Sequence, residues 1–230
     1  MKDLIVIIPA YNPPKRFIPY VEELEKLGFL KIIIVNDGSH MDSEPMFTKL
    51  KNKDDVILLH HSVNRGQGFS LKKAYSFILK QKFPCIGVIT VDADWQHAID
   101  DVIKVSQLFL ESPTTPVLGV RDFNAKQVPM TRKFANGLTN AIFSFLYSKK
   151  IHDTQSGLRV FPIKLLPELC KIKGERFEYA LMVLIELVTK KIEIRECTIQ
   201  TIYYKEKKAS TFRPVRDSMR ILKIMWNGKR

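Results

Sequence analysis

The sequence predicts an α/β protein with a mostly parallel central sheet covered by helices on both faces. Short aliphatic runs alternate with helical stretches along the first 120 residues, which is typical of a parallel sheet. Polar clusters follow four of those runs, at the places where strands would end. The chain has 230 residues, of which 45% are hydrophobic, so it can bury the core of one large domain.

Each expected strand is a short run of aliphatic residues that stops at a proline, a turn signal or a polar residue. The first, "LIVII", ends at Pro9, and the second, "KIIIV", runs into the turn signal "NDGS". Because the runs are apolar throughout, both faces of these strands should be buried. The predicted strands cover residues 4–8, 31–35, 56–60, 86–91 and 117–120, with a short strand after "DTQSG" and strand character in "IEIRECTIQTIYY".

The expected helices lie between these runs. Apolar residues recur at helical spacing from about residue 15 to residue 27, where Gly28 ends the pattern. Another helix should follow the glycine-containing loop "NRGQG". The second half of the chain is less regular. The predicted helices cover residues 15–27, 69–81, 131–147 and 177–190.

The clusters "PAYN", "NDGS", "NRGQG" and "DADWQ" lie just beyond the ends of the first four strands. Ligands of open parallel sheets bind outside the carboxyl ends of the strands. The four loops should therefore meet at one edge of the sheet and form a pocket. The glycines of "NRGQG", Gly66 among them, allow close backbone approach to a phosphate or sugar. The spacings of a dinucleotide fingerprint and of a P-loop are absent.

Two carboxylates, Asp92 and Asp94, end the fourth strand with one alanine between them. Oxygen ligands suit Mg²⁺ and Mn²⁺, and Mg²⁺ usually shares its site with substrate phosphates. An isolated pair of this kind is more often a solvated loop, but the three neighbouring loops favour an ion site. His97 is not expected to be a ligand, because a hard cation seldom needs imidazole.

Six segments appear in one order along the chain: "VIIPAYN", "VNDGS", "NRGQG", "VDADWQH", "DTQSGLRVF" and "RFEYALMVLIE". Together they resemble glycosyltransferase family 2, which has the GT-A fold, and within it the dolichyl- and polyprenyl-phosphate sugar synthases. The resemblance covers about residues 3–226. It implies a catalytic domain over residues 1–212. The spacing of apolar and basic residues predicts that residues 213–230, which follow, form a basic amphipathic helix.

Residue by residue, the resemblance implies a donor site and a metal site. Asp37 would meet the base, expected to be uracil, and Asp92 would lie near the ribose and the metal. The nucleotide would be bound by Pro9, Ala10, Tyr11, Asn12, Asp37, Gly66 and Asp92. The cofactor, Mg²⁺ or Mn²⁺, would be held by Asp92, Asp94 and Gln96.

The resemblance also implies a site for the phosphate of an acceptor lipid, held by Arg121, Arg132, Asn136 and Arg159. Asp94 and Arg132 are then catalytic candidates. The chain departs from the family pattern in three places: Pro13-Pro14 follow "PAYN", Gln67 stands where many relatives have lysine, and Ala180 replaces an acid. In that order, these departures concern binding of the nucleotide, a contact with a phosphate and a contact with the acceptor.

The activity implied is an inverting, metal-dependent transfer of a sugar from a nucleotide sugar, most simply a UDP-sugar, to polyprenyl phosphate. A lipid phosphate is already anionic, so arginines that position it suffice. A glycan hydroxyl would instead need a base, for which Asp153 is the candidate; its alternative role is to cap loop amides. The sequence is also compatible with a nucleotidyltransferase, and with a basic binding module whose pocket has decayed.

The net charge is +13, and residues 200–230 hold +7 of it, with nine basic and two acidic residues. In that tail Val215, Met219, Leu222 and Trp226 form an apolar stripe flanked by cations. This predicts peripheral contact with the inner face of a membrane, on the cytoplasmic side, rather than binding to nucleic acid. The alternative is an amphipathic helix that packs on its own domain. A membrane subunit or a second copy of the chain is a further expected type of partner. No signal peptide is visible, and three scattered cysteines predict no disulfide framework.

Overall fold

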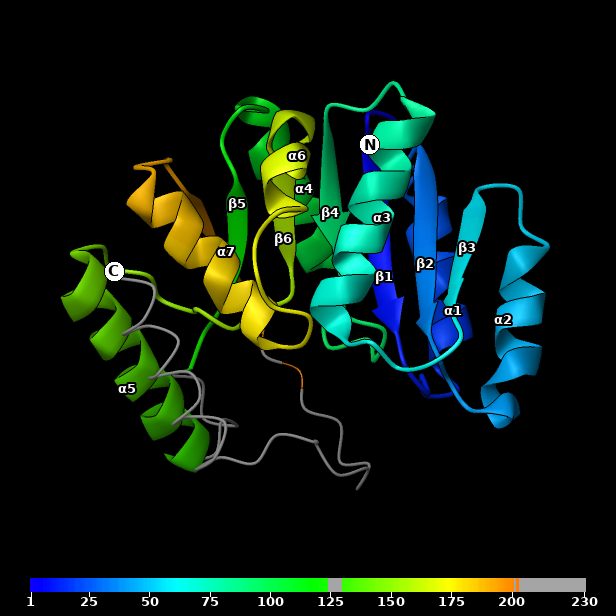
Figure 1. Cartoon of the computed structure of the whole chain (residues 1–230), viewed down its shortest axis with the longest axis horizontal. Helices are drawn as coiled ribbons and strands as arrows, with labels where there is room; N and C mark the ends of the chain where they lie inside the picture. The colour runs from blue at the N-terminus through cyan, green and yellow to red at the C-terminus, as the bar shows by residue number, and fades with distance from the viewer. Residues whose placement is uncertain (124–129, 201, 203–230) are drawn as a thin grey trace.

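The computed structural model describes residues 1–123, 130–200 and 202, and it shows a twisted central sheet between two layers of helices (Figure 1). The sheet has seven strands in the order β3-β2-β1-β4-β6-β5-β7. Every neighbouring pair is parallel except those that involve β6, which runs antiparallel to β4 and to β5. The strands are β1 (Leu4–Ala10), β2 (Lys31–Asp37), β3 (Val56–His61), β4 (Gly87–Thr90), β5 (Val117–Arg121), β6 (Arg159–Pro162) and β7 (Arg195–Ile199).

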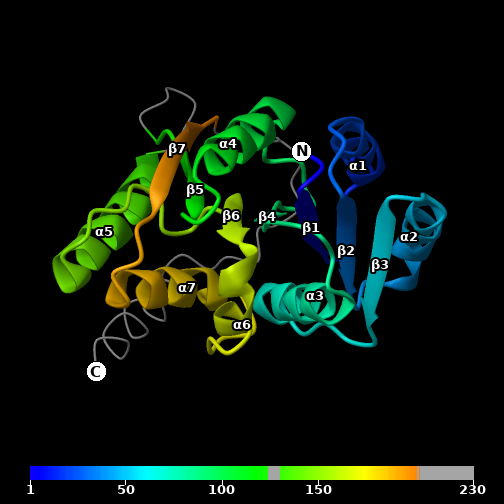
Figure 2. The same cartoon turned by 90° about the horizontal axis from the view of Figure 1, so that it is seen from above.

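Helices cover the two faces of the sheet, as the view from above shows (Figure 2). One face carries α1 (Phe17–Lys26), α2 (Glu44–Lys51) and α4 (Ile99–Glu111). The other carries α3 (Gln67–Gln81), α6 (Leu166–Leu169) and α7 (Glu178–Thr189). The helix α5 (Met130–Tyr147) packs beside α7 and β5 at one end of the sheet.

The alternation of side chains along β1 explains why its sequence is apolar throughout. Leu4, Val6 and Ile8 point into the core around α1 and α4. Ile5 and Ile7 point the other way, into the core around α3 and α7. All five are fully buried, because the strand lies in the middle of the sheet with helices on both sides.

The structure confirms the predicted fold class and adds two features that were not predicted from the sequence. First, α2 and α4 form in segments where no helix was expected, and both cover the face that carries α1. Second, β6 pairs antiparallel with β4, and Arg159 lies opposite Thr90. This pairing brings the "DTQSG" loop, residues 153–157, to the same edge of the sheet as the four polar loops.

Two predictions concern membranes and the tail of the chain. Among the described residues, no helix combines the length and the apolar character needed to cross a bilayer. The predicted tail helix, residues 213–230, lies outside the described residues.

Candidate active site at the carboxyl edge of the sheet

The loops after β1 and β2 are joined into one structure by hydrogen bonds. Asn12 has a left-handed backbone, with φ of 46°, and its N–H donates to Ser39 Oγ at 2.9 Å. The Asn12 side chain accepts from the His40 N–H at 2.8 Å. The Asn36 side chain in turn accepts from the Ser39 N–H at 2.9 Å. The "PAYN" and "NDGS" clusters therefore form a single rim, as their positions in the sequence predicted.

Tyr11 is an exposed residue of this rim, with 46% of its surface accessible, and its ring lies 6.0 Å from that of His40, which is also exposed. Pro9 and Ala10 are the last residues of β1, and Ala10 is buried. Of the residues expected to bind a nucleotide in this loop, Tyr11 offers an open aromatic face, whereas Pro9 and Ala10 contribute backbone at the edge of the sheet.

Asp37 is buried at the end of β2 and organises the "NRGQG" loop. Its Oδ1 accepts from His61 Nδ1 at 2.7 Å and from the Arg65 N–H at 2.9 Å. Its Oδ2 accepts from Asn64 Nδ2 at 3.0 Å and from the Gly66 N–H at 2.7 Å. Both oxygens are thus used by donors of the protein itself. This geometry does not support the predicted contact of Asp37 with a base, and it gives the carboxylate a role inside the fold.

Gly66 begins α3 with a left-handed backbone, φ of 101°, and is packed against the loop before α7. A Cβ there would lie 2.5 Å from the Glu175 carbonyl oxygen, so only glycine fits. Because its N–H is already donated to Asp37, this glycine serves close packing between loops rather than an open phosphate cradle.

Asp92 lies at the end of β4 and is held from three sides. Its Oδ1 accepts from Gln67 Nε2 at 3.1 Å, and its Oδ2 pairs with Nε2 of the buried His97 at 3.0 Å. A Cβ added to Gly157 would lie 2.5 Å from Oδ1 and 2.6 Å from Oδ2, so the bare backbone of that glycine leaves room for the carboxylate. Burial raises the pKa of Asp92, but the hydrogen bond and charge of His97, with the charges of Arg121 and Arg159, outweigh it and hold the pKa below its ordinary value.

Asp94 begins a tight turn that continues through Trp95 and Gln96. The Gln96 N–H donates to Asp94 Oδ1 at 3.2 Å, and the Gln96 side-chain amide donates to Oδ2. Trp95 has a left-handed backbone, with φ of 58°, which costs a bulky residue about 1–2 kcal/mol. Burial and the negative charge of Asp92 raise the pKa of Asp94 above its ordinary value.

The two carboxylates fit a divalent cation that is shared with a diphosphate. They are hard oxygen donors. The pKa of Asp94 is raised by burial and then by the charge of Asp92, and a cation would stabilise the ionised form against both effects. Within the part of the chain that the structure describes, no three His, Cys, Asp or Glu side chains gather to hold an ion by themselves. A cation here would therefore need ligands from a substrate, which is the usual habit of Mg²⁺. The Nε2 atom of His97 pairs with Asp92, so His97 holds this carboxylate in place.

Asp153 is fully buried and forms a two-pronged ion pair with Arg121, at 2.7 Å to Nε and 3.1 Å to a terminal nitrogen. It also accepts from the backbone N–H groups of Arg121, Gln155 and Ser156. Both oxygens are occupied and shielded, so the geometry does not support Asp153 as a general base. It supports the alternative, an aspartate that caps the amides of its loop. Arg121 keeps 24% of its side chain exposed.

Arg159 is also buried, and its guanidinium donates to the backbone carbonyls of Ser156, Ala180 and Thr154. Burial lowers the pKa of Arg159 to about 10, although the charge of Asp153 opposes this shift. The side chain is buried and three of its five N–H groups donate to these carbonyls, so the geometry gives no support to the predicted contact with an acceptor phosphate. Arg159 instead ties the "DTQSG" loop to α7.

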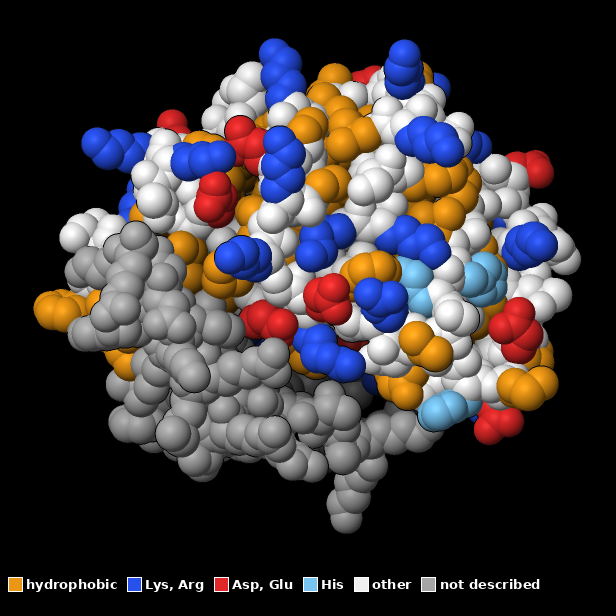
Figure 3. Space-filling model, viewed as in Figure 1, with side chains coloured by type: hydrophobic (Ala, Val, Ile, Leu, Met, Phe, Trp, Pro, Cys, Tyr) orange, Lys and Arg blue, Asp and Glu red, His pale blue; other side chains and the backbone are white. Residues whose placement is uncertain are grey.

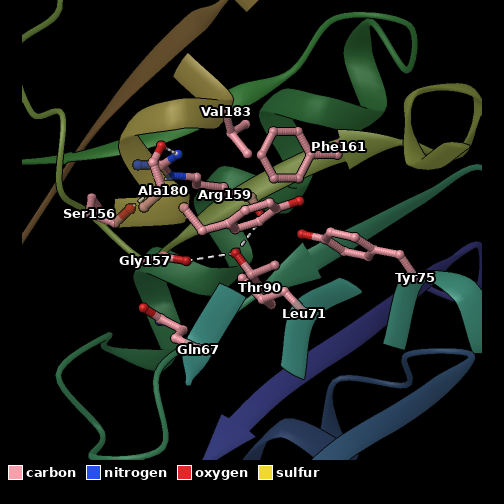
Figure 4. Close-up of a pocket in the computed structure, with 11 residues that line it drawn as sticks. Gln67, Leu71, Tyr75, Thr90, Ser156, Gly157, Arg159, Phe161, Ala180 and Val183 are labelled. Carbon is pink, nitrogen blue, oxygen red and sulfur yellow. Dashed lines mark hydrogen bonds between the residues drawn. The ribbon is translucent and has the colours of Figure 1, made fainter. Parts of the chain in front are cut away.

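Beside Arg159 lies a small cavity of about 20 Å³, room for about one water molecule (Figure 4). Thr90 Oγ1 donates to the Gly157 carbonyl at 2.6 Å along its wall, and Tyr75 points into it from α3. The cavity is too small for a sugar, and its lining includes Gln67, Ser156 and Gly157 from two of the loops. Two other predicted acceptor residues, Arg132 and Asn136, lie in α5. The structure describes their backbone but not their side chains.

Comparison with known proteins agrees with this geometry. The family model described as "Glycosyl transferase family 2" matches residues 5–169. The chain belongs to glycosyltransferase family 2. This match contains the four polar loops, both carboxylates and the "DTQSG" loop, so the family assignment and the candidate site refer to the same residues. The predicted family and enzyme class are thereby confirmed.

Two relatives in this family carry informative names. The UDP-N-acetylglucosamine–dolichyl-phosphate N-acetylglucosaminyltransferase of Methanococcus voltae is 33% identical over 225 residues, which cover 88% of this chain and 86% of that protein. The human dolichyl-phosphate beta-glucosyltransferase is 26% identical over 182 residues, 70% of this chain and 55% of that protein. The branch predicted from the motifs is therefore the one in which these relatives are found.

Solved structures confirm the fold. Glucosyl-3-phosphoglycerate synthase of Mycobacterium tuberculosis, crystallised with Mn²⁺, uridine diphosphate and glucosyl-3-phosphoglycerate, has a TM-score of 0.71 and 13% identity, over 99% of this chain and 80% of that one. A second crystal of the same enzyme, with Mn²⁺, uridine diphosphate and phosphoglyceric acid, has a TM-score of 0.73 and 12% identity, over 99% and 78% of the chains. At these identities the likeness shows the GT-A fold alone.

Three contacts around the carboxylates were not predicted from the sequence. The hydrogen bond between His97 and Asp92, the close approach of Gly157 to Asp92 and the left-handed turn at Trp95 all depend on tertiary structure. The motif "VDADWQH" contains His97 and Trp95 but gives no sign of what they contact. On the face that carries α3 and α7, the Lys and Arg side chains of the described residues are scattered rather than gathered in one place, so they do not mark the site there (Figure 3).

Proposed function

We propose that this enzyme transfers a sugar from a UDP-sugar to a polyprenyl phosphate of the dolichyl type, with inversion at the anomeric carbon and with Mg²⁺ or Mn²⁺ as cofactor. The observation that carries the proposal is the pair Asp92 and Asp94 at the carboxyl edge, where the pKa of Asp92 lies below its ordinary value and that of Asp94 above it. A relative that is named for this type of acceptor supports it. The Mn²⁺ and uridine diphosphate in a protein of the same fold support the cofactor and the donor.

In this proposal Asp94 and Gln96 face the donor diphosphate, and Asp92 lies toward the nucleoside. A bound divalent ion supplies Lewis-acid stabilisation of the departing nucleoside diphosphate. The protein's own task is to keep Asp92 charged and fixed, through Gln67 and His97, before the donor arrives. Preorganised charge of this kind costs no rearrangement during the reaction.

The acceptor chemistry agrees with a buried Asp153. An oxygen of the lipid phosphate attacks the anomeric carbon, the bond from that carbon to the diphosphate oxygen breaks, and the nucleoside diphosphate leaves. The attacking oxygen is already anionic, so no proton has to be removed by the protein. Arg121 has an exposed edge beside Asp153 and, with Arg132 on α5, is the proposed anchor for the acceptor phosphate.

A peripheral position at the cytoplasmic face of a membrane is part of the proposal and rests on the sequence of the tail. The apolar stripe and cations of residues 213–230 have the pattern of a helix that lies in a membrane interface. A membrane subunit or a second copy of the chain would be compatible with such a position.

The test is a panel of UDP-sugars and other nucleotide sugars, each incubated with polyprenyl phosphate and Mn²⁺ or Mg²⁺ and analysed by mass spectrometry. We expect one lipid-linked sugar, with nucleoside diphosphate released in equal amount. The product should be lost in Asp94→Asn and in the presence of a chelator. Asp100→Asn, which removes an acid at the start of α4, is the matched control and should keep full activity. Full activity in chelator, or no product with any donor, would contradict the proposal.

A further inference from the structure

The turn that carries Asp94 has a backbone conformation that its own sequence does not favour. Trp95 is left-handed, with φ of 58°, a conformation that tryptophan rarely adopts. Such a residue stays in place only where its surroundings determine it strongly. The residues that pack around this turn therefore help to shape the site.

Two side chains from the start of α1 hold the turn, one on each side of the peptide that follows Asp94. The Arg16 Nε–H donates to the Asp94 carbonyl oxygen at 2.8 Å. The Tyr20 ring stacks on the Trp95 ring, with centroids 5.2 Å apart and planes 26° from parallel. Tyr20 itself is fully buried, so the surface against which Trp95 packs is fixed by the core.

Arg16 and Tyr20 act as a unit because they lie one helical turn apart. The Tyr20 N–H donates to the Arg16 carbonyl at 3.1 Å, the spacing that places two side chains on one side of a helix. Arg16 holds the carbonyl group of Asp94, and Tyr20 holds the side chain of Trp95. Both contacts join α1 to a loop far along the sequence, so no local motif reveals them.

We propose that Arg16 and Tyr20 are positioning residues for donor binding, which hold Trp95 in its left-handed turn so that Asp94 and Gln96 face the diphosphate. This inference rests on the proposed function, because it assumes that Asp94 meets the donor. Neither residue needs to touch the substrate. Without them, the peptide between Asp94 and Trp95 relaxes to an ordinary conformation and carries both ligands away from the site.

The first test needs neither donor nor metal. Trp226→Phe leaves Trp95 as the single tryptophan of the chain, so its emission reports on the turn. In this background, Tyr20→Leu should shift the emission to longer wavelength and make it easier to quench with acrylamide. Phe17→Leu is the matched control, because Phe17 is a buried neighbour on α1 that packs on Phe47. It should leave the emission unchanged, and an unchanged emission in Tyr20→Leu would overturn the inference.

The second test measures the binding of UDP in the presence of Mn²⁺ by calorimetry. Arg16→Gln and Tyr20→Leu should each weaken binding about ten-fold, the factor that matches the cost of the left-handed turn. Arg16→Lys keeps the positive charge but removes the planar guanidinium donor. Its binding of UDP should therefore be weakened as much as that of Arg16→Gln. Phe17→Leu should bind as the parent does.

A double-mutant cycle separates the turn from general damage. Glycine adopts φ of 58° without penalty, so in a Trp95→Gly background Tyr20→Leu should no longer affect UDP binding. An equal loss in both backgrounds, or unchanged UDP affinity in Tyr20→Leu, would overturn the positioning role. If the parent protein binds no UDP with Mn²⁺, the proposed function fails instead, and the emission test alone decides whether α1 holds the turn.

Discussion

Gly157 provides the sharpest test of how Asp92 is held. In Gly157→Ala the new Cβ would lie 2.5 Å from Asp92 Oδ1 and 2.8 Å from its Cγ. Ordinary carbon contacts begin at about 3.5 Å, so the carboxylate must move by roughly 1 Å. It cannot do this freely, because Gln67 and His97 hold its two oxygens. A misplacement of about 1 Å at a reacting centre can cost about 100-fold in rate, and we expect kcat/KM to fall by about that factor.

The Gly157→Ala protein should be moderately destabilised but still folded. One hydrogen bond to Asp92 is lost, at about 1 kcal/mol, and crowding by the new Cβ costs about 1–3 kcal/mol, which the restriction of the unfolded chain offsets by about 0.4–1 kcal/mol. The Tm should therefore fall by roughly 3–12 °C, so that the folded protein can be assayed well below it. The control is Gly137→Ala on α5, where an added Cβ meets nothing within 4 Å, and it should keep full activity. Unchanged kcat/KM in Gly157→Ala, or a loss of activity explained by unfolding, would refute this reasoning.

Three further substitutions have distinct expected outcomes. Asp37→Asn turns an acceptor for the "NRGQG" loop into a donor and should lower the Tm by about 5–10 °C, measured by thermal unfolding. Asp94→Asn should raise the Tm of the metal-free protein at pH 7, because the pKa of Asp94 is raised in the folded state and its ionised carboxylate is therefore destabilising. This increase in Tm should shrink as the pH falls through the folded-state pKa toward 3.8. Asp153→Asn should lower the Tm by more than about 5 °C, since it breaks a buried ion pair; a loss of kcat at unchanged Tm would restore Asp153 as a base.

The sheet was predictable because its strands carry their own signal. Residues buried on both faces must be apolar throughout, and the runs that begin at Leu4, Lys31 and Val56 correspond to β1, β2 and β3. The run from Ile86 to Val91 is shorter in the structure, where β4 covers Gly87–Thr90. The antiparallel β6 was expected only as a short strand, because nothing local to a strand states its direction or its neighbour.

The edge on which the site lies was also predictable, since it follows from the rule for parallel sheets. The roles of single residues were not. Asp37, Asp153 and Arg159 are polar residues next to the site, and their sequence context resembles that of ligand-binding residues. Whether they serve a ligand or the fold depends on burial and on partners from distant segments, such as Arg121 for Asp153 and the Ala180 carbonyl for Arg159. The part that His97 plays in holding Asp92 is likewise visible only in three dimensions.

The central claim is that Asp92 and Asp94 hold a divalent cation together with the diphosphate of a nucleotide-sugar donor. The most direct measurement is the binding of Mn²⁺ to the protein, followed by electron paramagnetic resonance with and without UDP. We expect the protein to bind a single Mn²⁺ ion tightly only when UDP is present. This binding should be lost in Asp94→Asn and retained in Asp100→Asn. Binding of Mn²⁺ and UDP by Asp94→Asn that is as tight as in the parent protein would contradict the central claim.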